Sequence, residues 1–188
     1  MRQHAGDGRC GVSLLATIHA ASTAELEQKP LYRELLAKWA GYLLRHGVDP
    51  ENQLCTDDFA GHLAHNCNLS LKAIMGLAGY ARLCGMWGDR QEAARFDAAA
   101  REMAASWLEG DGSFRLAFDQ PGTFSMKYNA VWDKLFGTGL FPAAAMEREF
   151  ASYAARLNPY GMPLDNRADY TKSDWLVWTA TLAPDKEQ

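Results

Sequence analysis

The stretch TDDFAGHLAHNCNLSLKAI, from Thr56 to Ile74, decides how this chain folds because its character changes in the middle. Its first part carries two acids, two histidines and two asparagines, and its second part is apolar with helical spacing. One Asn, Asp, Ser or Thr is enough to cap a helix. The surplus of polar groups therefore indicates a connection rich in polar side chains, which leads into a helix and has a role beyond capping.

Two later stretches repeat this arrangement, KYNAVWDK (127–134) and LDNRADYTKSDW (164–175). Connections longer than about 12 residues are usually functional or disordered. These three are rich in Trp, Tyr, Asn and Asp rather than in Pro, Ser and Gln, which favours ordered structure. We expect the three connections to form the rim of one cleft.

Outside these connections, apolar residues recur with the spacing of amphipathic helices. Gly88-Asp89 separates two helices by a short turn, and Pro142 suits the first turn of another helix. One further helix is predicted over 125–136. For the other helices the predicted inward faces are Leu31, Leu35, Trp39 and Leu43; Leu69, Ala73, Leu77, Tyr80 and Cys84; Phe96, Ala100, Met103 and Trp107; Met146, Phe150, Tyr153 and Leu157; and Trp175, Trp178, Thr179 and Leu182.

The sequence contains no convincing run of alternating strand residues, so the predicted fold class is all-α. Short and long connections alternate along the chain, which predicts stacked antiparallel helical hairpins. In such a stack the short turns gather on one side and the long connections on the other. The 188 residues fit one domain with a sizeable core.

Composition excludes several classes of partner. The net charge of −4 and the absence of a basic run argue against nucleic-acid binding. No apolar run approaches the roughly 18 residues of a membrane span, and the early run VSLLATIHAA is a poor signal peptide. Cysteines 10, 55, 67 and 84 form no CxxC pair, and we expect reduced, partly buried thiols.

Three long stretches carry a family resemblance: residues 31–83, MKYNAVWDKLFGTGLFP (126–142) and LNPYGMPLDNRADYTKSDWLVWTA (157–180). They resemble the six-hairpin domain of the glutaminase A family, from about Leu31 to Leu182. The resemblance implies an (α/α)6 toroid, similar to that of many glycosidases. It also implies a hydrolase that releases ammonia from L-glutamine, in a secreted or periplasmic parent protein, although this chain shows no signal peptide from which to assign a location.

The chain departs from the family pattern at both ends. Family members carry an acidic pair where this chain reads Gly8-Arg9-Cys10-Gly11, and they continue into further hairpins beyond the last Trp-rich helix. We therefore expect residues 1–30 to form a divergent segment with the first helix. We expect residues 31–188 to form an incomplete six-hairpin domain, a fragment that self-associates through its incomplete edge.

Amide hydrolysis requires a base for water, a proton for the departing amine and donors for the oxyanion. The three polar connections contain carboxylates that could act in catalysis, and polar or aromatic side chains that could bind the substrate that the resemblance implies. The predicted catalytic residues are Asp57, Asp58, Asp165 and Asp174. The predicted substrate-binding residues are His62, Asn66, Asn68, Lys127, Tyr128, Asn129, Asp133, Arg167, Tyr170, Lys172 and Trp175.

Structural alternatives exist for most of these residues. Asp57, Asp58 and Asp174 suit caps or turns, the asparagines suit backbone bridges, and the aromatic residues suit a core. His62 and His65 lie three residues apart but lack a third placed ligand, so we predict no metal and no cofactor. Two alternative functions also stay open, a carbohydrate-active hydrolase with a saccharide substrate and a noncatalytic helical fragment.

Overall fold

The computed structural model describes residues 30–51, 60–109 and 115–183, with side chains from residue 33 onward. The helices within these ranges are α2 (Pro30–His46), α3 (Cys67–Met86), α4 (Arg90–Glu109), the 3-10 helix η2 (Tyr128–Ala130), α5 (Val131–Phe136), α6 (Ala143–Ala154) and α7 (Ser173–Ala180). The same ranges contain only isolated β-bridges and no extended strand. The predicted all-α class is confirmed.

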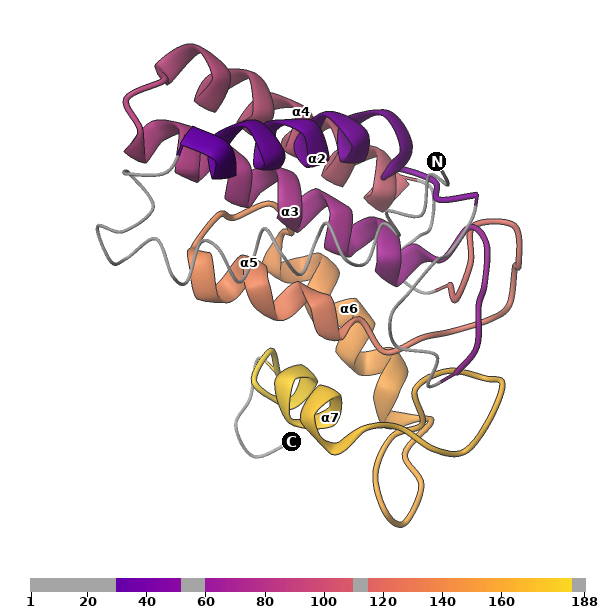
Figure 1. Ribbon diagram of the computed structural model, residues 1–188. Helices are drawn as coiled ribbons and strands as arrows, with labels where there is room; N and C mark the ends of the chain where they lie inside the picture. The colour runs from indigo at the N-terminus through magenta and orange to yellow at the C-terminus, as the bar shows by residue number, and fades with distance from the viewer. Residues whose placement is uncertain (1–29, 52–59, 110–114, 184–188) are drawn as a thin grey trace.

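Helix α3 lies at the centre of the molecule, with α2 and α4 on one side and η2 and α5 on the other (Figure 1). It is apolar around nearly its whole circumference, from Leu69 to Cys84. A helix of this composition is stable only when neighbours cover every face. The predicted stripe on α3 is confirmed.

Helices α3 and α4 form an antiparallel hairpin joined by the short turn at Gly88 and Asp89. The Asp89 carboxylate accepts a hydrogen bond from the Glu92 amide, so the predicted cap is confirmed. The predicted inward face of α4 is also confirmed, because Phe96, Ala100, Met103 and Trp107 are buried. Trp107 Nε1 donates to the Cys67 carbonyl oxygen at 2.9 Å, so its one polar atom has a partner inside the core.

The predicted inward face of α2 is confirmed at Leu43 and displaced by one residue at Leu35 and Trp39. The buried side chains are Leu36, Ala40 and Leu43, whereas Leu35 is 37% exposed and Trp39 is half-buried. Small residues explain why the buried face of α2 differs from the predicted one, because Ala40 and Gly47 let the helix approach α3 closely. A Cβ atom at Gly47 would lie 2.7 Å from the Ala73 Cβ.

The predicted single helix over 125–136 is also wrong in its first half. Ser125 forms an isolated bridge with Asp165, and the Met126 amide donates to the Leu164 carbonyl oxygen at 2.7 Å. These contacts hold the backbone extended until η2 begins at Tyr128. A tertiary contact with residues almost forty positions away therefore overrides the local helical pattern.

The last two predicted faces are partly correct. In α6, Tyr153 is buried, Met146 and Phe150 are half-buried and Leu157, which lies beyond the helix, is 62% exposed. The position that completes the buried face is occupied by Glu149. In α7 only Thr179 is buried, and the predicted Trp175, Trp178 and Leu182 are half-buried.

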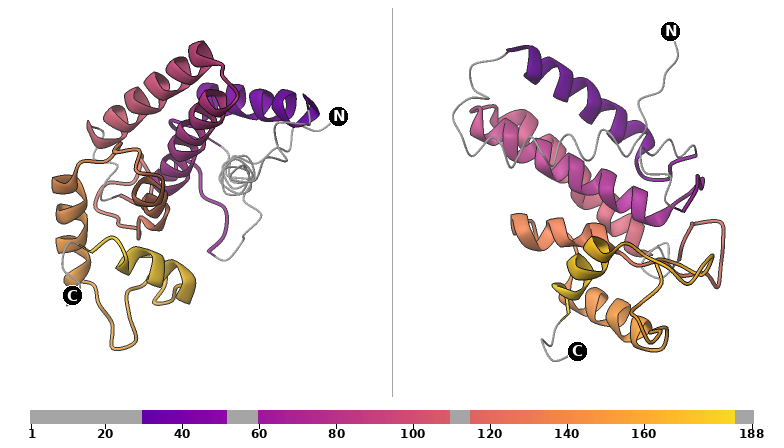
Figure 2. Two further views of the ribbon diagram at one scale, coloured as in Figure 1. Left: turned by 90° about the vertical axis from the view of Figure 1, so that its left-hand side faces the viewer. Right: turned by 60° about the horizontal axis from the view of Figure 1, so that its bottom comes forward.

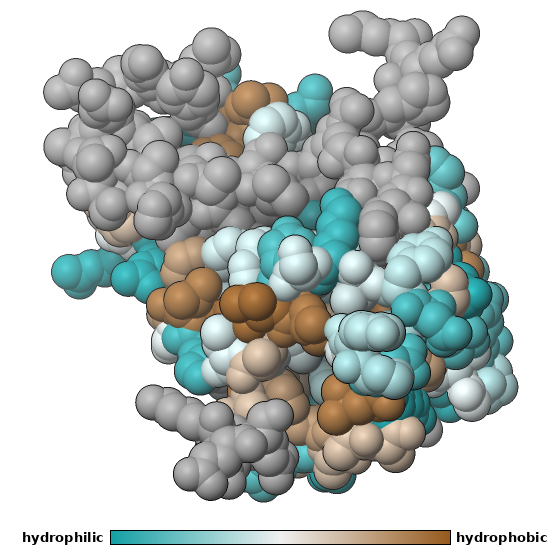
Figure 3. Space-filling view, turned by 90° about the horizontal axis from the view of Figure 1, so that it is seen from below, coloured by the Kyte–Doolittle hydropathy of each residue, from teal (hydrophilic) through white to brown (hydrophobic). Residues whose placement is uncertain are grey.

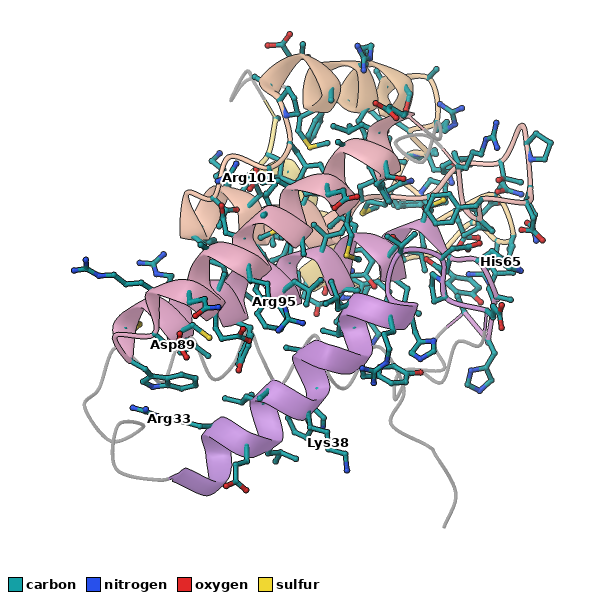
Figure 4. The ribbon with its side chains drawn as sticks, turned by 90° about the horizontal axis from the view of Figure 1, so that it is seen from above. Arg33, Lys38, His65, Asp89, Arg95 and Arg101 are labelled. Atoms are coloured by element: carbon teal, nitrogen blue, oxygen red, sulfur yellow. The ribbon has the colours of Figure 1, made fainter. Side chains whose placement is uncertain are left out.

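The connections divide between two ends of the molecule. The short turns after α3 and α5 lie at one end, and the described parts of the long connections after α2, α4 and α6 lie at the other (Figures 1 and 2). Figure 4 shows Asp89 at the first end and His65 at the second. Helices α3, α5 and α7 therefore all begin at the end with the long connections, as the alternation of connection lengths predicts.

Candidate functional site

Three long connections, which we call the first (47–66), second (110–127) and third (155–172), meet at this end through the parts that the structure describes. The first and second are joined at the start of α3, where the Phe118 amide donates to the His65 carbonyl oxygen at 2.8 Å. The second and third are joined by the bridge between Ser125 and Asp165. The third returns to the first through Arg167, whose Nη1 donates to the Ala60 carbonyl oxygen at 2.7 Å.

Lys127 ends the second connection and its side chain is almost completely buried. Its ammonium donates to the carbonyl oxygens of Arg115 and Ser125 at 2.9 and 2.8 Å, and to the Ser125 hydroxyl at 2.9 Å. Three donors are all that an ammonium has. In the structure, this predicted substrate-binding residue uses them to hold its own connection together.

The charge of Lys127 is balanced by Glu149 on α6, with 3.5 Å between Nζ and Oε1. Burial lowers the pKa of Lys127 and raises the pKa of Glu149, and the attraction between the two groups opposes both shifts. Tyr153 completes the group: its hydroxyl donates to Glu149 Oε1 and accepts from the Lys127 amide, each at 2.8 Å. The backbone and the side chain of Lys127 are thus both fixed to α6.

Asp165 and Arg167 form a second fixed group, in the third connection. Arg167 Nε and Nη2 donate to the two carboxylate oxygens of Asp165 at 2.9 and 2.7 Å, and the Arg167 amide adds a bond of 2.9 Å. Asp165 is 3% exposed, and its hydrogen bond raises the pKa of the Arg167 guanidinium. Both oxygens of this predicted catalytic carboxylate are engaged.

The asparagines act on the start of α3. Asn66 caps the helix, because its side-chain oxygen accepts from the amides of Asn68 and Leu69 at 2.9 and 3.0 Å. Asn129 in η2 is buried, and its amide nitrogen donates to the carbonyl and side-chain oxygens of Asn68 at 3.2 and 3.3 Å. These contacts join the first turn of α3 to the segment that follows the second connection.

Aromatic side chains cover the start of α7. The rings of Tyr128 and Trp175 are stacked with 4.3 Å between centroids and 5° between planes. The Lys172 ammonium lies 4.7 Å from the centroid of the Trp175 ring, where it makes a cation–π contact. Tyr128, Lys172 and Trp175 are half-buried, so these three predicted residues lie together at the surface of the connection end.

The remaining predicted residues are divided among three places. His62, Tyr170 and Asp174 are exposed in or next to the connections. Asp133 is not brought to this end: its carboxylate accepts hydrogen bonds from Thr138, Leu140 and Phe141 in the short turn before α6. Asp57 and Asp58 lie outside the residues that the structure describes.

Sequence reasoning did not single out Glu149 or the pairing of His65. Glu149 occupies a helical position between the apolar residues Met146 and Tyr153, and a lone carboxylate inside an apolar stripe is a signal for a buried charge partner. Asp49 lies 16 residues before His65, and no local pattern joins them. Across the described ranges there is no group of three or more His, Cys, Asp or Glu able to hold a metal.

Comparison with known proteins agrees with this architecture. The family model for the glutaminase A six helical-hairpin domain matches residues 9–188. The chain belongs to the glutaminase A six helical-hairpin family. Its hairpins with alternating short and long connections are consistent with that domain, and no solved structure matches the chain.

Two curated proteins show how this family member relates to others. Glutaminase A of Aspergillus oryzae is 31% identical over 182 residues, which cover 93% of this chain and 26% of that protein. A probable glutaminase of Arthroderma benhamiae is 32% identical over 182 residues, which cover 79% of this chain and 21% of that protein. The chain therefore spans about a quarter of the length of these relatives. No helix in the described part is long and apolar enough to cross a membrane.

Proposed function

We propose that this chain is part of a glutaminase-type amidohydrolase, which hydrolyses the side-chain amide of L-glutamine to L-glutamate and ammonia. The observation that carries the proposal is the family match over residues 9–188, together with two relatives that are both named as glutaminases. The meeting of three long connections at one end supports it, because residues from distant parts of the sequence converge there.

The contacts suggest a division of labour among the predicted residues. Lys127 and Asp165 are buried and engaged by Glu149 and Arg167, so we assign them the positioning of the second and third connections. Asp174 is exposed in the first turn of α7, where a carboxylate can take a proton from water. We assign water activation to Asp174 together with Asp57 and Asp58 of the first connection.

Substrate recognition requires groups of both signs, because glutamine is a zwitterion. Arg167 has five N–H donors, and its bonds to Asp165 and Ala60 use three of those on the side chain. The remaining donors of Arg167 bind the α-carboxylate of the substrate. A carboxylate of the connections binds the α-amino group, and the activated water attacks the side-chain amide.

The decisive experiment measures ammonia released from L-glutamine by the intact chain. An Asp57→Asn variant and an Asp174→Asn variant are compared with Asp97→Asn, a control on the exposed face of α4 where Asp97 pairs with Arg101. We expect the first two variants to lose about 100-fold or more in kcat, as for loss of an acid–base group. The control retains activity.

Reducing-sugar release from oligosaccharides is measured in parallel. Sugar release without ammonia release would replace the amidase with the carbohydrate-active alternative. A helical, cooperatively folded chain that releases neither product would contradict catalysis by this chain and favour the noncatalytic alternative. Arg167→Lys provides a further check, because lysine keeps the charge and loses the paired geometry. We expect this variant to raise KM for glutamine more than it lowers kcat.

A further inference from the structure

His65 lies where the first connection ends, directly before the cap of α3. Its backbone is left-handed, with φ of 58°, which is unusual for a residue other than glycine. Such a conformation persists only where neighbouring contacts fix it. Here the His65 amide donates to the Pro50 carbonyl oxygen at 2.7 Å, and the His65 carbonyl oxygen accepts from the Phe118 amide at 2.8 Å.

The side chain adds a third link at the same point. His65 Nδ1 lies 2.8 Å from Asp49 Oδ1, and the two side chains are 33% and 48% exposed. Asp49 follows the end of α2 and His65 precedes the start of α3, so this contact joins the two ends of the first connection. The backbone of His65 then joins the first connection to the second.

Three carboxylates lie near enough to His65 to raise its pKa. Asp49 and Glu51 belong to the first connection, and Asp119 belongs to the second. The hydrogen bond to Asp49 raises the pKa of His65 most, its charge and those of Asp119 and Glu51 raise it further, and burial opposes them. A raised folded-state pKa means that the attraction stabilises the fold below the ordinary histidine value near 6.5, and that this stabilisation is lost as pH rises through the folded-state value.

We propose that His65 and Asp49 form a pH-sensitive ion pair, which holds the first and second connections together more tightly when the imidazole is protonated. The ionised pair fixes the Asp49 and His65 ends of the first connection. It thereby keeps the His65 carbonyl oxygen in place for the Phe118 amide. Loss of the proton removes the charge that binds Asp49 and leaves three carboxylates around a neutral ring. The inference does not depend on glutaminase activity.

The test uses NMR on the intact chain. The His65 ring is titrated, and exchange of the Phe118 amide is measured between pH 5.5 and 8 after correction for intrinsic exchange. We expect the Phe118 protection factor to be about two- to fivefold higher at the acidic end, the ratio that a partly exposed ion pair supplies. Asp49→Asn should abolish most of this difference and lower the His65 pKa. Asp119→Asn, which removes only a more distant charge, should reduce the difference slightly.

His65→Asn is the matched variant for the backbone, because asparagine tolerates the left-handed region and does not titrate. Its Phe118 protection should be independent of pH. A titration midpoint for His65 at or below its ordinary value would overturn the proposal. So would a pH-independent Phe118 protection factor in the unmodified chain, or the same pH dependence in Asp49→Asn.

Discussion

Lys127 and Glu149 face each other inside the protein, with 3.5 Å between Nζ and Oε1 and each residue only 1% exposed. The pair joins the second connection to α6 across a sequence distance of 22 residues. Its ammonium also binds two backbone carbonyl groups. A charge in this position has no access to water if its partner is removed.

We therefore predict that Lys127→Met destabilises the chain by about 3–5 kcal/mol, because it leaves an uncompensated buried carboxylate. Urea denaturation measures the free energy of unfolding. The double variant Lys127→Met with Glu149→Gln should lose less free energy of unfolding than the two single variants lose in sum, since neither charge is then buried alone. Lys38→Met is the control, because Lys38 is exposed on α2 (Figure 4) and should change stability by no more than about 0.5 kcal/mol. A Lys127→Met loss as small as that of the control would contradict the assigned role.

Substitution by alanine should change the free energy of unfolding in opposite directions at two glycines, Gly41 within α2 and Gly47 directly after it. At Gly47 a Cβ atom would meet the Leu43 carbonyl oxygen at 2.6 Å and the Ala73 Cβ at 2.7 Å, so Gly47→Ala should destabilise the fold by about 1–3 kcal/mol. At Gly41 the nearest atom is Arg45 Nη1 at 3.6 Å. Gly41→Ala should stabilise the helix by about 0.5–1 kcal/mol. Thermal and urea unfolding of both variants test the pair, and equal effects would show that α2 does not pack closely on α3 at Gly47.

The thiols of α3 should be inert in the folded protein. Cys67 and Cys84 are free and buried, and burial raises the pKa of Cys67 to about 12 and also raises that of Cys84. At pH 8 both groups are therefore neutral thiols, which are poor nucleophiles. Alkylation followed by peptide mass mapping should leave both residues unmodified until denaturant is added. Rapid labelling of Cys67 in the native protein would mean that the start of α3 opens readily.

Apolar side chains are exposed on helices α5 and α7. Leu135 is 64% exposed and Val177 is 60% exposed, and the half-buried rings of Trp132 and Trp178 contact each other at 5.6 Å between centroids. Figure 3 shows apolar side chains gathered on the face seen from below, the side on which α7 lies in Figure 1. Surfaces of this kind mark interaction sites.

We predict that the chain binds a hydrophobic dye or forms dimers through the exposed apolar side chains of α5 and α7. The variant carrying Leu135→Ser and Val177→Ser should reduce dye fluorescence and shift sedimentation towards the monomer. Leu35→Ser is the control, because Leu35 is exposed to a lesser degree on α2. A monomer without dye binding, measured by analytical ultracentrifugation and fluorescence on the unmodified chain, would contradict the prediction.

The helical hairpins could be predicted from sequence because their signals are local. Apolar spacing identified the buried face of α4 at Phe96, Ala100 and Met103, and one aspartate at position 89 identified the start of that helix. On α2 the predicted Leu43 is buried, but Leu36 and Ala40 are buried in place of the predicted Leu35 and Trp39, because the spacing of large apolar side chains does not show how closely two helices pack. Close packing selected Ala40 and Gly47, whose lack of bulk determines how near two helices can approach.

The candidate site was less predictable because its contacts are long-range. The alternation of short and long connections predicts that the long ones share one end, where their described parts lie, but residue type did not reveal which polar groups bind one another. A lysine and an arginine in polar connections suggest ligand binding, yet Lys127 is paired with Glu149 and Arg167 with Asp165. The pairing of Lys127 depends on a helix that the sequence marks only by one carboxylate in an apolar stripe.

The bond from Arg167 to the Ala60 carbonyl oxygen spans 107 residues. The turn between α3 and α4, in contrast, closes over a few residues and costs little chain entropy. During synthesis the central hairpin can therefore assemble early, while the end with the long connections must wait until Arg167 has emerged. Folding kinetics should show this order as a fast helical phase followed by a slower one in which distant segments find each other.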